Sequence, residues 1–511
     1  MISGAEYMRR ELMIRLVRLF DQGKLDEELD RIPIRVRPKD GEASRCCVYH
    51  DRAVLKYRLM ALLGMRCEEE TDEAQTLAGY FQDADAREKA PGDPPLTVCT
   101  AGCSGCPDNS YVVTGNCRGC FARPCVFNCP KNAISVVNQV SQIDYTKCIK
   151  CGKCMNVCPF HAIVKTTVPC EDACPVGAIR KNAQGRAEID FEKCIFCGKC
   201  FRACPFSAIM ERSQLLDVLN VLKRKPAHVA AVVAPSAYSQ FPGTIEQLFT
   251  AISKLGFDDV VEAALGAELT SANEAQEFLE KMSGGQRLMT TSCCPAYVEL
   301  VKRHFPDFLQ YVSHTPSPMK YAAQLVREKD PDAVVVFIGP CIAKRHEAEE
   351  SGLVDYVLTF EELGSMMAGR QIDVISQEPW TLLTPAGENA RNFAKSCGVT
   401  ESVLADMTRP KCGTCGESGK CGENAENPCV ENGQCGENAE NPCVENGQCS
   451  GNTETPCGEN FELKAKFING IDRKTLSQLK LLAMGKDPAN FLEVMACPGG
   501  CVNGPCSLHV K

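Results

Sequence analysis

Cysteines in three distant segments of the sequence are the residues whose types and spacing indicate metal chemistry. The segments read Ser-Cys-Cys-Pro at 292–295, Gly-Pro-Cys-Ile-Ala-Lys at 339–344 and Ala-Cys-Pro-Gly-Gly-Cys at 496–501. None of these spacings is typical of a disulfide framework or a zinc site, and each segment follows a predicted strand. Far upstream lie cysteine runs typical of iron–sulfur sites. Together these patterns predict a buried metal centre that receives electrons through a chain of clusters.

Two of the upstream runs have the spacing Cys-x-x-Cys-x-x-Cys-x-x-x-Cys-Pro, which is typical of 4Fe–4S sites in bacterial ferredoxins. They cover residues 148–159 and 194–205. In two-cluster ferredoxins the fourth cysteine of each run binds the other cluster. Structural zinc is the alternative occupant of such thiols. The ferredoxin rule predicts two ligand sets: Cys148, Cys151, Cys154 and Cys204 for one cluster, and Cys194, Cys197, Cys200 and Cys158 for the other.

The remaining cysteines of this block leave the number of clusters open. One group resembles a third run, a second group resembles the closing half of a fourth, and three further thiols precede both. They can hold one or two further 4Fe–4S clusters, with zinc as the alternative for the last group, and their spacing does not decide the connectivity. The three groups are Cys117, Cys120, Cys125 and Cys129; Cys170 and Cys174; and Cys99, Cys103 and Cys106.

The composition predicts a reduced protein of more than one domain. The chain has 511 residues, 44% of them hydrophobic, and a net charge of −9, which gives no support to nucleic-acid binding. Most of the 35 cysteines have metal-ligand spacings that require free thiols. The start of the chain has no signal-peptide pattern, and no run approaches the roughly 20 apolar residues that span a bilayer. We therefore expect a cytoplasmic protein without a membrane segment.

Three domains are predicted from the distribution of apolar residues and cysteines. Residues 1–95 form a mostly helical region and linker, residues 96–212 an α+β ferredoxin-like iron–sulfur domain, and residues 213–511 an α/β domain. Apolar runs at 229–233, 288–291 and 333–338 predict parallel strands covered on both faces. Each run ends just before a candidate site segment, as ligands in open α/β sheets lie beyond the carboxyl ends of strands.

A cysteine-rich repeat interrupts the α/β domain at about 411–458. Residues 421–434 recur identically at 435–448, and a decayed third copy follows. The repeat is polar and rich in Gly and Asn, so it cannot build an apolar core. It is interpreted as a surface insertion expanded by duplication, with a metal-binding loop as the alternative.

The three site segments resemble the signature segments of the FeFe hydrogenases, in order and in separation. The resemblance covers roughly residues 96–511, and its departures look like the group B branch. It implies an H-cluster between two lobes of the α/β domain, in which a 4Fe–4S cubane is joined to a two-iron unit with CO, cyanide and a bridging dithiolate. It also implies the residues that hold this cofactor: Cys294, Cys341, Cys497 and Cys501 on the cubane, with Cys501 bridging to the two-iron unit.

The resemblance assigns further residues around the two-iron unit. Cys293 matches the proton-relay thiol, and Lys344 matches the lysine that binds a cyanide ligand. The segment of Ala234, Pro235 and Ser236 matches the one that packs around the other diatomic ligands, and Met495 matches a methionine near the two-iron unit.

A proton path is also implied. Glu274 and Glu277 are three residues apart on a predicted helix, so they share a face, and alone they would be interpreted as a solvated helix surface. They align with the two relay glutamates of the family, and Ser313 aligns with the serine between them. Among the departures from the family pattern, Gly339 stands where a methionine is usual, and Lys281 replaces an arginine at the outer end of the path.

The predicted function is reversible conversion of protons and electrons into H2. Electrons would enter from ferredoxin or a similar small carrier through two to four additional 4Fe–4S clusters, and maturation proteins would insert the two-iron unit. Two alternatives are a hydrogen sensor, although no sensory module is visible, and a non-catalytic iron–sulfur assembly protein of the same fold.

Overall fold

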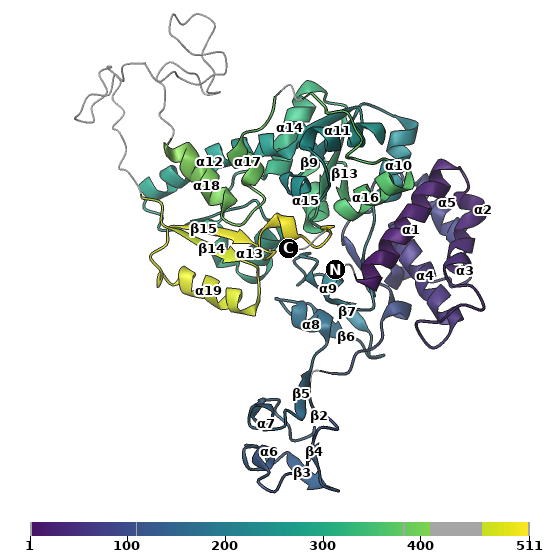
Figure 1. The fold of residues 1–511 in the computed structure, drawn as a ribbon. Helices are drawn as coiled ribbons and strands as arrows, with labels where there is room; N and C mark the ends of the chain where they lie inside the picture. The colour runs from purple at the N-terminus through teal and green to yellow at the C-terminus, as the bar shows by residue number, and fades with distance from the viewer. Residues whose placement is uncertain (1–2, 109, 382–383, 409–461, 509–511) are drawn as a thin grey trace, which may run out of the picture.

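The computed structural model describes residues 3–108, 110–381, 384–408 and 462–508. The repeat predicted at about 411–458 lies outside the described residues. Figure 1 shows a helical N-terminal region beside a larger α/β part, with the cysteine-rich segment extending below both. No helix among the described residues is long and apolar enough to cross a membrane.

Two parallel sheets form the core of the α/β part. The first has the strand order β10-β9-β12-β13 and the second has the order β11-β15-β14, and all neighbouring pairs are parallel. Every residue of β9 and of β15 is buried, as expected for strands covered on both faces. The strands are β9(Val229–Val233), β10(Asp259–Glu262), β11(Met289–Thr290), β12(Val334–Gly339), β13(Tyr356–Thr359), β14(Ala465–Asn469) and β15(Phe491–Met495).

Helices cover both sheets, and the site segments leave the carboxyl ends of four strands (Figure 1). Pro235 follows β9, Cys293 follows β11, Cys341 follows β12 and Cys497 follows β15. The two sheets therefore direct their carboxyl ends at one region of the molecule. The helices are α10(Leu215–Arg224), α11(Ile245–Lys254), α12(Ala263–Ser283), α13(Pro295–His304), α14(Pro318–Lys329), α15(Ala343–Ser351), α16(Phe360–Gly369), α17(Glu388–Asn392), α18(Gly398–Thr408) and α19(Arg473–Ala483).

The cysteine-rich segment forms two lobes. The inner lobe, residues 96–108 and 167–211, contacts the α/β part, and the outer lobe, residues 110–166, projects away from it (Figure 1). Each lobe is built from antiparallel strand pairs and short helices. The inner lobe has β1(Leu96–Val98), β6(Ile179–Lys181), β7(Ala187–Ile189), β8(Ile209–Glu211), α8(Pro169–Ala173) and α9(Lys199–Ala203); the outer lobe has β2(Ser110–Val113), β3(Ile134–Val137), β4(Val140–Ile143), β5(Ile163–Thr166), α6(Pro124–Phe127) and α7(Lys153–Asn156).

The N-terminal helices pack on the α/β part through α1. Leu12, Leu16 and Phe20 bury one face of α1 in the same apolar core as β9 and β12. On this interface the Arg9 guanidinium donates two hydrogen bonds to Glu361, at 2.7 and 2.9 Å, so the buried charge is neutralised. The helices of this region are α1(Gly4–Asp21), α2(Leu25–Glu28), α3(Ile32–Val36), α4(Val48–Leu62) and α5(Leu77–Ala86).

Candidate active site

Four cysteine thiols converge where the two sheets meet. Burial, and then the neighbouring Cys294 and Cys501, raise the pKa of the Cys341 thiol to about 12. Burial, and then Cys341, Cys501 and Cys294, raise the pKa of Cys497 well above its usual value. Thiols affect one another in this way only at short range, because electrostatic interactions fall with distance. The structure therefore brings together the four cysteines that the sequence predicts as ligands of one cubane.

Local backbone structure directs these thiols at one point. Cys294 is the N-cap of α13, with Pro295 in the first turn. Burial raises the pKa of Cys294, whereas N–H groups of Ala496 and Tyr297 act in the opposite direction and favour the thiolate that binds metal. Gly500 has a φ of +89°, and a Cβ atom there would lie 2.5 Å from the carbonyl oxygen of Ala394. The turn that returns the chain to the centre at residue 501 therefore requires glycine.

A buried ammonium lies beside the four thiols. The Lys344 Nζ atom donates to Glu347 Oε2 at 2.6 Å and to Ser317 Oγ at 3.2 Å. Burial alone would lower the pKa of Lys344, but the Glu347 carboxylate raises it, so the amine is charged. An ammonium has three N–H donors, and these contacts use two of them.

The predicted relay residues form a connected path from the centre towards the surface. Burial, and then the Glu274 carboxyl, raise the pKa of Cys293 well above its usual value, which places these two groups close together. Burial raises the pKa of Glu274 to about 8, and Ser313 lies close enough to lower it in part. The Ser313 hydroxyl donates to Glu277 Oε2 at 2.6 Å.

The outer end of this path is charged and reaches solvent. Burial would raise the pKa of Glu277, but Lys281, Ser313 and the backbone N–H of His314 lower it to about 2. Lys281 Nζ lies 2.8 Å from Glu277 Oε1, and the His314 side chain is exposed. The path therefore runs from a buried neutral acid to an ionised one at the surface.

The segments predicted to pack around a cofactor also lie here. Ala234, Pro235 and Ser236 leave β9, and Met495 ends β15, where it packs with Cys293 and Cys501. Ser236 is 1% exposed, and its hydroxyl has no hydrogen-bond partner among the described residues. A buried hydroxyl without a partner is costly unless a bound group supplies one.

The family described as "Iron only hydrogenase large subunit, C-terminal domain" matches residues 227–505, more than half of the chain. The chain belongs to the iron-only hydrogenase family. The description "4Fe-4S binding domain" matches residues 141–164 and 187–210 within the two lobes, which makes this hydrogenase-family chain an iron–sulfur protein.

Named relatives fall into two groups. The chain is 28% identical over 413 residues to "Iron hydrogenase 1" of Clostridium pasteurianum, covering 75% of this chain and 68% of that protein. It is 25% identical over 270 residues to "Cytosolic Fe-S cluster assembly factor NAR1" of Eremothecium gossypii, covering 49% of this chain and 59% of that protein. Across three curated hydrogenases the chain covers between 42% and 68% of the relative's length. A solved variant of the FeFe-hydrogenase HydA1 from Chlamydomonas reinhardtii shares 23% identity at a TM-score of 0.44, over 58% of this chain and 85% of that one.

The residues at this centre fit the cofactor implied by the hydrogenase family. The donor set is four thiols, which suits an iron–sulfur cubane. Beside them stand an ammonium with an unused donor, at Lys344, and a partnerless hydroxyl, at Ser236. Both are hydrogen-bond donors suited to anionic diatomic ligands such as cyanide.

The structure corrects the predicted pairing of the ferredoxin-like cysteines. Cys158 does not join the set of Cys194, and Cys204 does not join the set of Cys148; both predicted sets were wrong. In the inner lobe, burial raises the pKa values of Cys194, Cys197 and Cys170, and Cys174 adds to the rise for the first two and Cys204 for the third. Four sets of four thiols result: Cys174, Cys194, Cys197 and Cys200; Cys103, Cys106, Cys170 and Cys204; Cys117, Cys120, Cys125 and Cys158; and Cys129, Cys148, Cys151 and Cys154.

The physical reason is that the outer lobe is inserted between the two halves of the inner lobe. The fourth cysteine of each run still joins the set of another run, as in two-cluster ferredoxins. The two runs that exchange cysteines lie in the same lobe, however, and are not the runs at 148–159 and 194–205. Cys99 belongs to no set, since its sulfur lies 3.3 Å from that of Cys67 in the buried N-terminal interface. The set containing Cys197 is adjacent to the active-site thiols, because Cys197 contributes to the raised pKa of Cys497.

Three residues near the centre had no role in the sequence interpretation. Glu347 and Ser317 keep the Lys344 side chain in place through hydrogen bonds. Lys344 and Glu347 are three residues apart on one helix, and this spacing could have predicted their contact from the sequence. Phe337 occupies the space left at Gly339, because a Cβ atom on that glycine would lie 2.6 Å from the Phe337 ring. The aromatic ring thus covers Gly339 on the same face of β12.

Proposed function

We propose that the chain is a hydrogenase that converts protons and electrons into H2, and the reverse, at an H-cluster. The observation that carries the proposal is that a buried ammonium and a proton path both end at the same four thiols. A centre that only stored or transferred a cluster would need neither, since cluster ligation is complete with four thiolates. The relay runs through Cys293, Glu274, Ser313 and Glu277.

The chain would hold the cofactor through its thiols and hydrogen bonds. Cys294, Cys341 and Cys497 would bind the cubane, and Cys501 would bridge it to the two-iron unit. Lys344 and Ser236 would donate hydrogen bonds to the cyanide and neighbouring ligands, while Ala234, Pro235 and Met495 exclude water. When bound, the cofactor supplies the redox chemistry by which protons and electrons combine.

The protein residues then move protons. Glu277 is ionised and accepts a proton from solvent near His314 and Lys281. The proton passes through the Ser313 hydroxyl to Glu274, whose pKa of about 8 keeps it loaded at neutral pH. Glu274 in turn supplies Cys293, the thiol beside the centre.

Electrons would enter through the two lobes. All four cysteine sets would then hold 4Fe–4S clusters, and the set with Cys197 would pass electrons to the cubane. The outer lobe is the proposed docking site of ferredoxin or a similar carrier, since Phe121 and Phe127 on it are 102% and 82% exposed. Maturation proteins would insert the two-iron unit, in a cytoplasmic setting that keeps the thiols reduced.

The test is reconstitution of the purified chain with the two-iron cofactor. We expect infrared bands of CO and cyanide, together with H2 production from reduced methyl viologen. Absence of the bands would contradict the proposal and favour an assembly role, as in the relatives named as assembly factors. Bands without turnover would favour a hydrogen sensor.

A further inference from the structure

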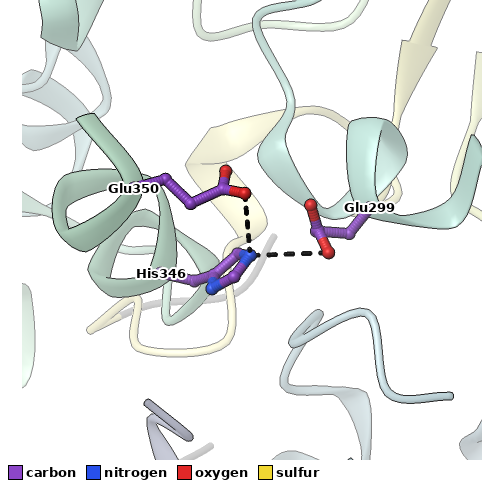
Figure 2. A group of neighbouring side chains, drawn as sticks. All are labelled: Glu299, His346 and Glu350. Carbon is purple, nitrogen blue, oxygen red and sulfur yellow. Dashed lines mark ion pairs between the residues drawn. The ribbon is translucent and has the colours of Figure 1, made fainter. Parts of the chain in front are cut away.

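Two helices that begin at the active-site cysteines bring three metal-ligand side chains together. Glu299 lies on α13, which follows Cys294, and His346 and Glu350 lie on α15, which follows Cys341 (Figure 2). The His346 Nε2 atom is 3.4 Å from Glu299 Oε2 and 3.8 Å from Glu350 Oε1. All three ligand atoms lie within 4.8 Å of one another.

The imidazole is oriented as a ligand. Its Nδ1 atom forms a hydrogen bond with the Asp93 carboxylate, and a carboxylate can only accept, so Nδ1 carries a proton. His346 is 7% exposed, and its Nε2 atom makes no hydrogen bond of normal geometry among the described residues; its nearest partner is the ion-pair contact with Glu299 Oε2 at 3.4 Å. Histidines that bind metals usually donate the other ring N–H to a carboxylate in this way, which fixes the tautomer and the ring orientation.

We propose that Glu299, His346 and Glu350 form a site for a divalent first-row transition ion, separate from the iron–sulfur centres. One imidazole nitrogen and two carboxylate oxygens suit Zn²⁺, Mn²⁺ or Fe²⁺. Ligand atoms bound at about 2.0–2.2 Å to one ion lie roughly 3–4 Å apart. The two measured separations fall in that range, so little rearrangement is needed.

Two cations hold the carboxylates in place. Lys302 Nζ lies 3.0 Å from Glu299 Oε1 and 2.9 Å from Glu350 Oε1, and Arg303 Nε lies 2.6 Å from Glu299 Oε2. Lys302 is 38% exposed and can withdraw into solvent. A divalent ion would replace its ammonium and the Nε2 proton together, which leaves the local charge unchanged.

The site also borders a cavity between the two helices and the segment that follows residue 309. The cavity has a volume of about 320 Å³ and is lined by all three ligands, by Ser313 of the proton path and by Glu347. Solvent in it can complete the coordination of an ion held by three protein ligands. The bound ion would fasten α13 to α15, the two helices that follow the first two cubane cysteines.

The test is a titration of the full, cluster-loaded chain with Mn²⁺, followed by the loss of the free-ion electron paramagnetic resonance signal. Mn²⁺ is the probe because it prefers oxygen and nitrogen ligands over the many thiols of this chain. We expect one ion per chain, and roughly 10-fold or more weaker binding in Glu350→Gln. The matched control is Glu328→Gln, an exposed carboxylate elsewhere on the surface.

A second variant should change the affinity for Mn²⁺ in the opposite direction. Lys302→Met removes the competing ammonium and should tighten Mn²⁺ binding several-fold. Both Glu350 and Lys302 are partly exposed, so their variants should keep the fold, which iron content and circular dichroism check. The proposal is overturned if the wild-type chain binds no stoichiometric Mn²⁺, if Glu350→Gln binds as the wild type does, or if Lys302→Met fails to bind more tightly. None of these results depends on hydrogenase activity.

Discussion

Two glutamates three residues apart on α12 have pKa values shifted in opposite directions. Glu274 is fully buried with its Oε2 atom unpartnered among the described residues, whereas Glu277 has Lys281 one helical turn away. Burial destabilises the first carboxylate, and a neighbouring ammonium stabilises the second. The pair therefore consists of a protonated carboxyl and an ionised one at neutral pH, as the proposed proton path requires.

Replacing Glu274 should interrupt proton delivery. We expect Glu274→Gln to lower H2 turnover by about 100-fold or more, because an amide cannot relay a proton from Ser313 to Cys293. CO and cyanide bands should remain, since Glu274 is no ligand. Steady-state H2 production with reduced methyl viologen measures the effect, and Glu280→Gln on the exposed face of the same helix is the control. Turnover near the wild-type rate in Glu274→Gln would remove this residue from the path.

The raised pKa of Glu274 gives a pH dependence. Its carboxyl group should be protonated below about pH 8 and ionised above it, whereas an ordinary glutamic acid ionises near 4.5. A protonated-carboxyl infrared band should therefore persist through neutral pH and fade as the pH rises through about 8. The band should be absent from Glu274→Gln, and a band that faded near pH 4.5 would contradict the buried assignment.

At the residue scale, the order and spacing of residues in the sequence identified the candidate site side chains, but not how they are buried, packed or protonated. Cys294, Cys341 and Cys497 were predicted by their segments, and the structure brings them together. The burial of Glu274 and the compensation of Gly339 by Phe337 depend on packing between distant strands and helices. Spacing along one helix carries no information on such contacts.

At the element scale, the carboxyl ends of parallel strands account for the position of the centre. Apolar runs predicted β9, β11 and β12 and placed site residues just after them, because a strand buried on both faces reads as a continuous apolar segment. The apolar runs did not predict the split into two parallel sheets. It depends on which strands pair, and β11 pairs with β15 some 200 residues later in the chain.

The packing of Phe337 against Gly339 on β12 can be tested directly. Gly339→Met should destabilise the fold by about 1–3 kcal/mol, because the added side chain overlaps the aromatic ring. The double variant Gly339→Met with Phe337→Ala should lose less stability than the two single changes together, since the methionine can occupy the space of the removed ring. Thermal unfolding of the cluster-loaded chain measures both. A double variant less stable than the sum of the single changes would contradict this packing.

The connectivity of the cysteine sets is also an element-scale property. Sequence spacing cannot show that β2 and β5 close the outer lobe as an insertion, so the two clearest runs were paired wrongly. We expect Cys158→Ser to affect an outer-lobe cluster and leave turnover with methyl viologen nearly intact. Cys174→Ser should disturb the cluster next to the cubane and slow turnover with every donor. Iron content and reduced-state electron paramagnetic resonance distinguish the variants, and equal effects on turnover would argue against the four sets.

At the scale of the whole molecule, charge is distributed unevenly. The chain has a net charge of −9, yet basic residues outnumber acidic ones seven to one between positions 110 and 166. All seven are exposed, and the outer lobe that carries them lies farthest from the α/β part (Figure 1). The seven are Arg118, Arg123, Lys131, Lys147, Lys150, Lys153 and Lys165. A basic lobe with exposed phenylalanines on an acidic protein is suited to an acidic electron carrier.

Charge reversal on the outer lobe should therefore slow electron delivery from an acidic ferredoxin without touching the chemistry. Lys131 and Lys150 are exposed, and we expect the double variant Lys131→Glu with Lys150→Glu to lower kcat/KM for ferredoxin by about 10-fold at low salt. The difference should shrink as ionic strength rises, because salt screens exposed charges. Turnover with methyl viologen, a small cation, should not fall. Lys329→Glu on α14 makes half of that charge change away from the lobe and should leave ferredoxin kinetics unchanged. If that control slowed ferredoxin turnover as much as the lobe variant did, only net charge would matter and docking at the outer lobe would be wrong.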